Sequence, residues 1–137
     1  MYHEIITTME IAITEGVKVS VETFYLPEYS VPSKRHYVFS YKIKIENLSA
    51  HKIQLLNRNW TIKDITGQER NVVNGKGVVG KEPILIPGES FEYNSGCHFP
   101  SPCGKMSGTY VMQRIEDKSL FEVEIPEFTL VPSFLNN

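Results

Sequence analysis

The sequence predicts an all-β protein built from two packed antiparallel sheets, and three observations support this. Apolar side chains recur at every second residue in several runs, which is the spacing of a strand with one buried face. Turn signals rich in glycine, proline and asparagine separate these runs about every 8–12 residues, as in small β-sandwiches. No stretch shows the periodicity of an amphipathic helix. With 137 residues, the chain is long enough for one domain with its own core.

The first half of the chain shows the alternation most clearly. Residues 17–26 alternate valines with polar residues, and this strand is expected to end before the following proline. Residues 37–45 carry the strongest signal, because five large apolar side chains occupy every second position: Tyr37, Phe39, Tyr41, Ile43 and Ile45. We expect a turn at 47–50 and a partner strand over about 53–65.

One face of that partner strand combines apolar residues with an arginine. Strict alternation places Leu56, Arg58, Trp60 and Ile62 on the same face. Trp60 is expected to anchor the core between the two sheets. Two interpretations of Arg58 remain open. Its stem covers the core edge while its head reaches water or is re-aimed by a bulge, or its guanidinium is buried and pairs with a carboxylate near a site.

The second half of the chain is predicted to contain shorter strands. They are expected over 91–95, 109–115 and 121–130, with turns at 66–67, 87–89 and 117–119. The segment 96–108 holds two prolines, three glycines and both cysteines, so we expect a long loop with at most a short strand. After Pro126 the apolar phase slips by one residue, which a bulge on an edge strand explains. In total, about seven strands predict an immunoglobulin-like or fibronectin type III-like sandwich.

The ends of the chain lack this pattern. Residues 1–12 show no firm period and are assigned to an N-terminal extension that docks a strand or a short helix on the domain. The domain itself is expected to span 13–131. Residues 132–137 are assigned to a C-terminal tail on the surface.

Composition excludes several kinds of partner. A formal charge of −2, from 14 basic and 16 acidic side chains, argues against nucleic acid and anionic membranes. No apolar run approaches the roughly 18 residues that a membrane span needs. The first residues lack the basic and apolar regions of a signal peptide, so Cys97 and Cys103 are expected to be free thiols in the cytoplasm. The oligomeric state stays open.

A glycine motif lies near the middle of the chain. Gly75, Gly77 and Gly80 have the G-x-G-x-x-G spacing of dinucleotide-binding loops. In that fold, a helix must follow the motif so that the phosphate rests on the helix N-terminus. Here Pro83 and Pro87 follow within a few residues, and each lacks the N–H that a helix requires. A dinucleotide-binding fold is therefore excluded.

Three interpretations of this glycine loop remain. It is a structural turn, because glycines allow positive φ and close backbone approach. It is a weak anion or nucleotide site, in which backbone N–H groups and flanking lysines hold a phosphate. It is a surface that docks a partner. The candidate residues for the last two are Gly75, Lys76, Gly77, Gly80 and Lys81.

Nothing else in the sequence assembles into a reactive site. Cys97 and Cys103 lie six residues apart, which is too far for a zinc knuckle, and no second pair exists. Ser95 lacks the G-x-S-x-G context of a nucleophile elbow. Glu122 and Glu124 are best interpreted as a solvated strand face. We therefore expect no metal, no cofactor and no catalytic residue.

Several short motifs, taken in order, resemble the ApaG family. They are Tyr25-Leu26, Ser30-x-Pro32, Tyr37-Val38-Phe39, Leu55-Leu56-x-Arg58-x-Trp60, Gly75-x-Gly77-Val78-Val79-Gly80, Pro87-Gly88-Glu89, Tyr93-x-Ser95-Gly96, Met106-x-Gly108-x-Tyr110 and Phe121-x-Val123-x-Ile125-Pro126-x-Phe128. The resemblance covers roughly residues 13–131. Asn59 and Asn74 depart from the residues that the family usually has at these two positions.

The resemblance implies a fibronectin type III-like sandwich and two hypotheses about function. Similar domains occur in F-box proteins and in a DNA-polymerase-delta-interacting protein, which implies a non-catalytic module that binds a protein partner. The family takes its name from a gene beside a diadenosine-tetraphosphate hydrolase, and its bacterial members are linked to cobalt tolerance and magnesium efflux. The alternative is thus a protein that weakly binds pyrophosphate or a dinucleoside polyphosphate, with a link to divalent-cation tolerance.

Overall fold

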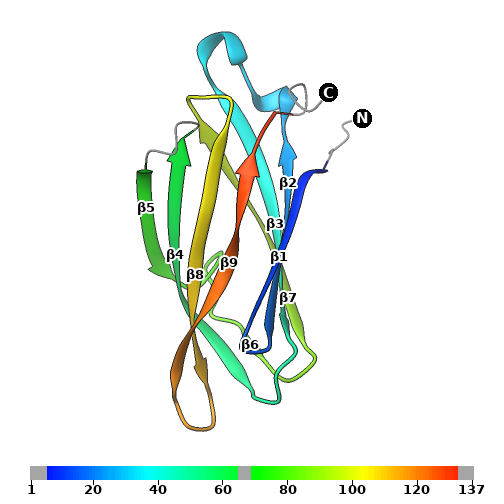
Figure 1. Cartoon of the computed structure of the whole chain (residues 1–137), viewed down its shortest axis with the longest axis vertical. Helices are drawn as coiled ribbons and strands as arrows, with labels where there is room; N and C mark the ends of the chain where they lie inside the picture. Colours follow the sequence, from blue (N-terminus) through cyan, green and yellow to red (C-terminus); the bar gives the residue numbers. More distant parts are fainter. Residues whose placement is uncertain (1–5, 65–68, 133–137) are drawn as a thin grey trace.

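Two antiparallel sheets pack face to face in the computed structural model of the chain, which describes residues 6–64 and 69–132 (Figure 1). The first sheet has the strand order β1 (Ile6–Thr14), β2 (Val17–Tyr25), β3 (Tyr37–Asn47) and β7 (Ser90–Phe99). The second has the order β5 (Glu69–Lys76), β4 (Ile53–Asp64), β8 (Gly104–Arg114) and β9 (Leu120–Leu130), and β6 (Ile84–Leu85) also pairs with β4. The predicted fibronectin type III-like sandwich is confirmed, with nine strands in the described residues where about seven were expected.

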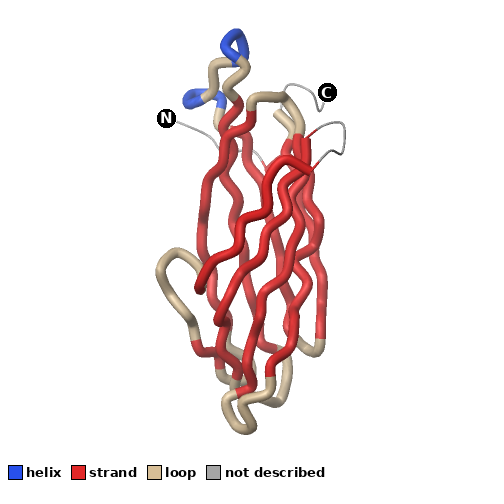
Figure 2. Tube along the Cα trace, turned by 90° about the vertical axis from the view of Figure 1, so that its left-hand side faces the viewer, coloured by secondary structure: helices blue, strands red, loops and turns tan. Residues whose placement is uncertain are grey.

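Helical structure in the described residues is confined to the β2–β3 connection. It consists of two single-turn 3₁₀ helices, η1 (Pro27–Tyr29) and η2 (Pro32–Lys34), which lie at one end of the long strands (Figure 2). Each begins with a proline, as expected where a missing N–H costs nothing. No helix among the described residues is long and apolar enough to cross a membrane.

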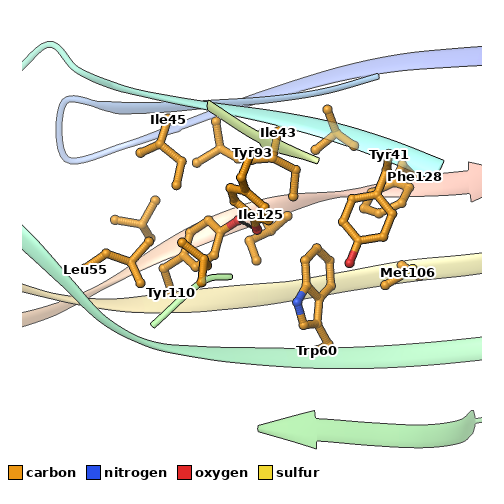
Figure 3. Close-up of a cluster of buried hydrophobic side chains, with 14 of the residues drawn as sticks. Tyr41, Ile43, Ile45, Leu55, Trp60, Tyr93, Met106, Tyr110, Ile125 and Phe128 are labelled. Atoms are coloured by element: carbon orange, nitrogen blue, oxygen red, sulfur yellow. Dashed lines mark hydrogen bonds between the residues drawn. The ribbon is translucent and has the colours of Figure 1, made fainter. Parts of the chain in front are cut away.

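The core lies between the sheets, where the sequence alternation places it. In β3, Phe39, Tyr41, Ile43 and Ile45 are buried, as predicted. Trp60 is also confirmed as a core anchor, because its ring centroid lies 5.8 Å from that of Tyr41 in the opposite sheet (Figure 3). Burial of each such side chain contributes about 1.5–3 kcal/mol to folding.

The strand predicted over 53–65 has the right position and the wrong partner. It is β4, and it lies in the second sheet, whereas β3 pairs with β2 and β7. Asn47, which is fully buried, holds the crossing between the sheets. Its Nδ2 donates to the carbonyl oxygens of His51 at 2.7 Å and Leu85 at 3.0 Å. These bonds satisfy a buried amide and direct the chain away from β3.

A bulge in β4 changes the face predicted for that strand. The pairing with β8 shifts between Leu55 and Asn57, so Leu56 is an extra residue without a counterpart. The prediction that Leu56 shares a face with Trp60 is therefore wrong. Arg58 and Trp60 do share a face, because both line the same hollow between the sheets.

The segment predicted as a long loop over 96–108 is mostly strand. β7 continues to Phe99 and β8 begins at Gly104, which leaves residues 100–103 as the connection. The glycines misled the prediction, because they provide room inside the sheets. A Cβ on Gly108 would lie 2.0 Å from the carbonyl oxygen of Asn59 on β4.

The end of the chain follows the sequence pattern closely. The hairpin turn at 117–119 is confirmed by the bond from Lys118 N–H to the Arg114 carbonyl, 2.9 Å. The bulge near Pro126 on an edge strand is also confirmed, because the β8–β9 pairing shifts between Met106 and Gly108 and β9 ends the sheet. The turn predicted at 66–67 and most of the C-terminal tail lie outside the described residues.

The two sides of the sandwich differ. On one side, β1 borders β9, and the Glu124 N–H donates to Thr14 Oγ1 at 3.1 Å (Figure 1). On the other side, the sheets end in β7 and β5. β1 includes most of the predicted N-terminal extension and pairs along β2, so this segment contributes a strand to the first sheet. The proposed boundary between residues 12 and 13 stays a prediction.

Candidate functional site: the glycine hairpin

The glycine motif lies where an edge strand is interrupted. β5 and β6 pair with successive parts of β4, so together they form one edge strand in two pieces. β5 ends with Lys76 opposite Asn57, and β6 begins with Ile84 opposite Gln54. Residues 77–83 leave the ladder between these points, opposite the bulge in β4. Interruption of this kind prevents the edge from templating another strand.

The excursion closes on itself as a small hairpin, which we call the glycine hairpin (residues 77–83). Val78 and Lys81 exchange both backbone hydrogen bonds, at 2.8 and 2.9 Å. Between them, Val79 has φ +44° and Gly80 has φ +77°, and positive values at both central residues define a type I′ turn. Asparagine usually occupies the first of these positions. A β-branched residue there is strained, by about 1–3 kcal/mol.

Arg58 holds the first limb of the hairpin. It lies directly opposite Gly75 in the β4–β5 ladder, and its Nη1 donates to the carbonyl oxygens of Lys76 at 3.0 Å and Gly77 at 2.7 Å. A Cβ on Gly75 would lie 2.7 Å from Nη2, so the guanidinium occupies space that is free because residue 75 has no side chain. Among the residues that the structure describes, the guanidinium binds two backbone carbonyls and forms no ion pair with a carboxylate, which favours the first interpretation of Arg58.

The β4 bulge anchors both limbs of the hairpin. The Gly77 N–H donates to the carbonyl of Leu56 at 2.7 Å, and Leu55 N–H donates to the carbonyl of Pro83 at 3.0 Å. Gly77 has φ +63°, and a Cβ there would lie 2.2 Å from the carbonyl oxygen of Lys81. Glycine is therefore required at this point. Bulge and hairpin form one unit, although they are distant in sequence.

The predicted anion-site residues separate into two groups. Lys76, Gly80 and Lys81 line a shallow hollow of about 290 Å³ together with Glu82. Lys76 Nζ lies 3.6 Å from a carboxylate oxygen of Glu82, so one lysine already has an acidic neighbour. Gly75 and Gly77 instead lie against Arg58 and the hairpin backbone. The N–H groups of Gly77, Val78 and Lys81 all donate to carbonyls within the chain.

A second hollow, of about 190 Å³, lies beside the hairpin tip and was not predicted from the sequence. Its lining residues come from four separate segments: Tyr41, Arg58, Trp60, Val78, Val79, Tyr93 and Ser95. No local motif signals such a hollow, because β3, β4, β7 and the hairpin each contribute one or two side chains. Its walls combine three aromatic rings and two valines with the Ser95 side chain and the Arg58 guanidinium. This arrangement suits an apolar side chain that carries a polar group.

The tyrosines beside this hollow are neutral hydrogen-bonding groups. Burial raises the pKa of Tyr41, against the opposing effect of its hydrogen bond with Ser95. Burial likewise raises the pKa of Tyr93, whose hydroxyl lies 2.5 Å from that of Tyr110 across the core (Figure 3). The hydroxyl groups therefore stay protonated well above neutral pH, and Arg58 supplies the positive charge of the hollow.

The cysteines and the paired glutamates considered in the sequence lie in different environments. Burial raises the pKa of the Cys97 thiol to about 12, so little reactive thiolate forms at neutral pH. Burial also raises the pKa of Cys103, and both cysteines are free thiols. Glu122 and Glu124 are exposed on β9, as predicted. In the described part of the chain, no three His, Cys, Asp or Glu side chains lie close enough to hold a metal ion.

The fold and the hairpin define a class: a small antiparallel β-sandwich with an edge strand interrupted by a glycine hairpin. The family model described as the ApaG domain matches residues 27–114 of this chain. The chain belongs to the ApaG family, as the sequence motifs predicted.

Individual relatives agree over nearly the whole chain. "Protein ApaG" of Brucella anthropi is 48% identical over 119 residues, which cover 87% of this chain and 90% of the relative. "Protein ApaG" of Paramagnetospirillum magneticum is 44% identical over 117 residues, covering 85% and 88%. The crystal structure of a Bordetella pertussis protein described as ApaA has a TM-score of 0.81 and 45% identity, covering 85% of this chain and 94% of that one. None of these names gives a catalytic activity.

Proposed function

We propose that this ApaG-family chain is a non-catalytic binding module that docks a protein partner on the tip of the glycine hairpin. One observation carries the proposal: Val79 is 54% exposed and has φ +44°, so the chain keeps an apolar, β-branched residue where asparagine or glycine would fold better. Strain of this kind is retained mainly at sites where the strained residue is used.

The hollow beside Val79 supports the same function. An exposed apolar tip next to a concave, aromatic surface is the arrangement found at the centre of protein interfaces. Tyr41 and Trp60 form part of its wall, and Arg58 adds a positive charge to it. A partner that inserts one apolar side chain here would contact Val79 at the same time.

The hairpin is also fixed before a partner arrives. The Val78–Lys81 bonds, the two carbonyls held by Arg58 and the anchoring bonds to the β4 bulge leave the tip little freedom. Each side chain or loop ordered during binding costs about 0.5–1.5 kcal/mol, and a rigid tip avoids much of this cost.

The test compares Val79→Asn with a matched control, Ile86→Asn. Val79 is 54% exposed and Ile86 is 51% exposed, but Ile86 lies outside the glycine hairpin. Proteins captured from the native cell by the wild-type chain are identified, purified and titrated against each variant. We expect Val79→Asn to weaken binding at least about tenfold, the loss of about 1.4 kcal/mol, and Ile86→Asn to leave it unchanged. Equal binding by both variants, or no reproducible partner, contradicts the proposal.

The alternative function is weak binding of pyrophosphate or a dinucleoside polyphosphate. It draws support from the hollow that Lys76, Gly80 and Lys81 share. Two or three charge-assisted contacts, less the cost of ordering, leave about 4 kcal/mol, which is millimolar affinity. Pyrophosphate is titrated into the labelled protein while the amide signals of residues 74–81 are followed by NMR. Shifts that disappear in a Lys76→Gln/Lys81→Gln variant favour this alternative, and an unmoved loop at several millimolar ligand ends it.

A further inference from the structure

The first sheet presents an apolar ridge to solvent along its edge strand. Met9, Ile11 and Ile13 on β1 are 55%, 49% and 63% exposed. Their orientation follows from the register, because Ile11 pairs with Ser20, whereas the neighbouring Val19 and Val21 of β2 face the core. β1 therefore turns its apolar side chains outward. A solvated strand face normally carries polar residues, so an exposed apolar ridge indicates an interaction surface.

Charged residues of alternating sign lie beside the ridge, in three rows that run across the strands. The register gives the rows from β1 to β7 as Met9, Glu22, Lys42 and Asn94; then Ile11, Ser20, Lys44 and Glu92; then Ile13, Lys18, Glu46 and Ser90. The first and third rows mirror each other in hydrophobic character and oppose each other in charge. Glutamate and lysine exchange places on both β2 and β3.

The two outer rows of this pattern are complementary to each other. A two-fold axis parallel to the sheet and along the middle row would lay a second copy over the first with the outer rows exchanged. Glu22 would then face Lys18 of the second copy, and Lys42 would face Glu46 of that copy. On the ridge, Ile11 would meet its own equivalent, and Met9 would meet Ile13. Lys44 and Glu92 would also lie opposite their own equivalents, and the ion pairs Lys44–Glu46 and Lys42–Glu92 within each copy would partly offset these like charges. Most soluble homo-oligomers are dimers with such an axis.

Two charges without a close ion pair support this arrangement, although Lys18 and Glu22 each lie opposite an oppositely charged residue of β3. Within a single chain, Lys42 Nζ lies 3.5 Å from Glu92 and Lys44 Nζ lies 2.9 Å from Glu46. Lys18 and Glu22 have no oppositely charged group within 4.0 Å in the part of the chain that the structure describes. They are the pair that the second copy would complete, twice per dimer. A hollow of about 300 Å³ in the same face leaves room for facing side chains to interlock.

We propose that the outer face of the β1-β2-β3-β7 sheet is a homodimer interface, in which the β1 ridges meet and Lys18 of each copy pairs with Glu22 of the other. Four strands about 4.8 Å apart and about 30 Å long present roughly 570 Å² per copy. A total near 1,100 Å² is at the low end for specific complexes, so the dimer is expected to be reversible, with a Kd in about the micromolar range. The interface leaves the glycine hairpin free.

Sedimentation velocity over a range of protein concentrations tests the proposal. The wild-type chain should shift from monomer to dimer as concentration rises. Ile11→Glu replaces the apolar contact at the centre of the ridge with two facing carboxylates. Unlike Lys44 and Glu92, which have ion-pair partners within each copy, this new charge would have no opposite charge facing it across the interface, so the Kd should rise at least about tenfold. Ile84→Glu is the matched control, because Ile84 is 46% exposed on β6, away from this face, and should leave the Kd unchanged. Thermal melts confirm that each variant is folded.

Charge exchange tests the geometry itself. Lys18→Glu and Glu22→Lys, each alone, put like charges in contact and should weaken the dimer. The two variants mixed, or both substitutions in one chain, restore opposite charges and should recover dimer formation. A wild-type chain that stays monomeric at about 1 mM overturns the proposal. So does a dimer that ignores Ile11→Glu, or single charge variants whose mixture does not recover.

Discussion

Glycines have different structural roles in the glycine hairpin and in β8. In the glycine hairpin, Gly77 and Gly80 have positive φ and let the chain reverse outside the ladder. In β8, Gly108 is part of a regular strand, and what matters is the space that a Cβ would take from the Asn59 carbonyl on β4. Sequence spacing does not distinguish these uses, so a glycine motif predicts neither a loop nor a ligand by itself.

The largest difference between the two regions should appear on adding one methyl group to β8. Gly108→Ala would bring Cβ to 2.0 Å from the oxygen of Asn59 and 3.0 Å from its carbonyl carbon, and a central strand cannot yield. We expect a loss of about 3 kcal/mol or more in the free energy of unfolding, measured by urea denaturation. A loss below about 1 kcal/mol would mean that β4 and β8 are less closely packed than their pairing indicates.

A methyl group in the hairpin should cost less. Gly77→Ala meets the Lys81 carbonyl and a positive φ, but a short excursion at a sheet edge can shift more than a central strand, so we expect a loss of about 2 kcal/mol. Gly80→Ala is the control, because nothing lies within 4 Å of its Cβ position and only the backbone conformation opposes it, at about 1 kcal/mol. Equal losses for the two variants would show that contact with Lys81 is unimportant.

Val79→Asn should change stability in the opposite direction. Asparagine tolerates the left-handed conformation of a type I′ turn, whereas valine does not. We expect the free energy of unfolding to rise by about 1 kcal/mol, with Tm rising accordingly. The same substitution is expected to weaken partner binding, so stability and function separate at one residue. A lower free energy of unfolding would mean that the Val79 side chain stabilises the domain through its own contacts, which would contradict the proposed role in partner binding.

Gly75→Ala should have the smallest effect. Its Cβ would meet the end of the Arg58 side chain, at 2.7 Å from Nη2, and a flexible side chain can move. We expect a loss below about 1 kcal/mol in chemical denaturation. Arg58→Lys tests the same contact from the other side, since lysine lacks the planar group that reaches both carbonyls. If Gly75→Ala costs as much as Gly77→Ala, the guanidinium is held more rigidly than its partly exposed position indicates.

The apolar alternation along the sequence correctly predicted features that depend on neighbouring residues. The alternation in β3 and the phase slip at Pro126 depend on residues next to one another, and both predictions are confirmed. Pairing is a property of distant segments, so β4 was assigned to the wrong neighbour. A bulge in this strand was considered only as one way to re-aim Arg58. Its position at Leu56 could not be predicted for the same reason, because the residues that bond to it lie in the excursion at 77–83, about twenty residues further along the chain.

The candidate site was predictable only in part. The motif located the hairpin, because glycine spacing marks positive φ and close approach. The hollow beside it could not be found, since Tyr41, Trp60 and Tyr93 come from three strands of two sheets. The apolar alternation of Met9, Ile11 and Ile13 was not recognised in a segment that was assigned no firm period, and alternation alone would not show that this face points outward. In each case the missing information is the arrangement of the strands.

Amide hydrogen exchange in the glycine hairpin tests most directly whether the motif closes on itself or stays open as an anion cradle. Protection is measured residue by residue by NMR, with and without pyrophosphate. The bonds of Gly77, Val78 and Lys81 predict slow exchange at these three amides and fast exchange at Val79 and Gly80, unchanged by the ligand. Fast exchange at all five amides, with protection that appears only when pyrophosphate is added, would contradict a self-closed hairpin.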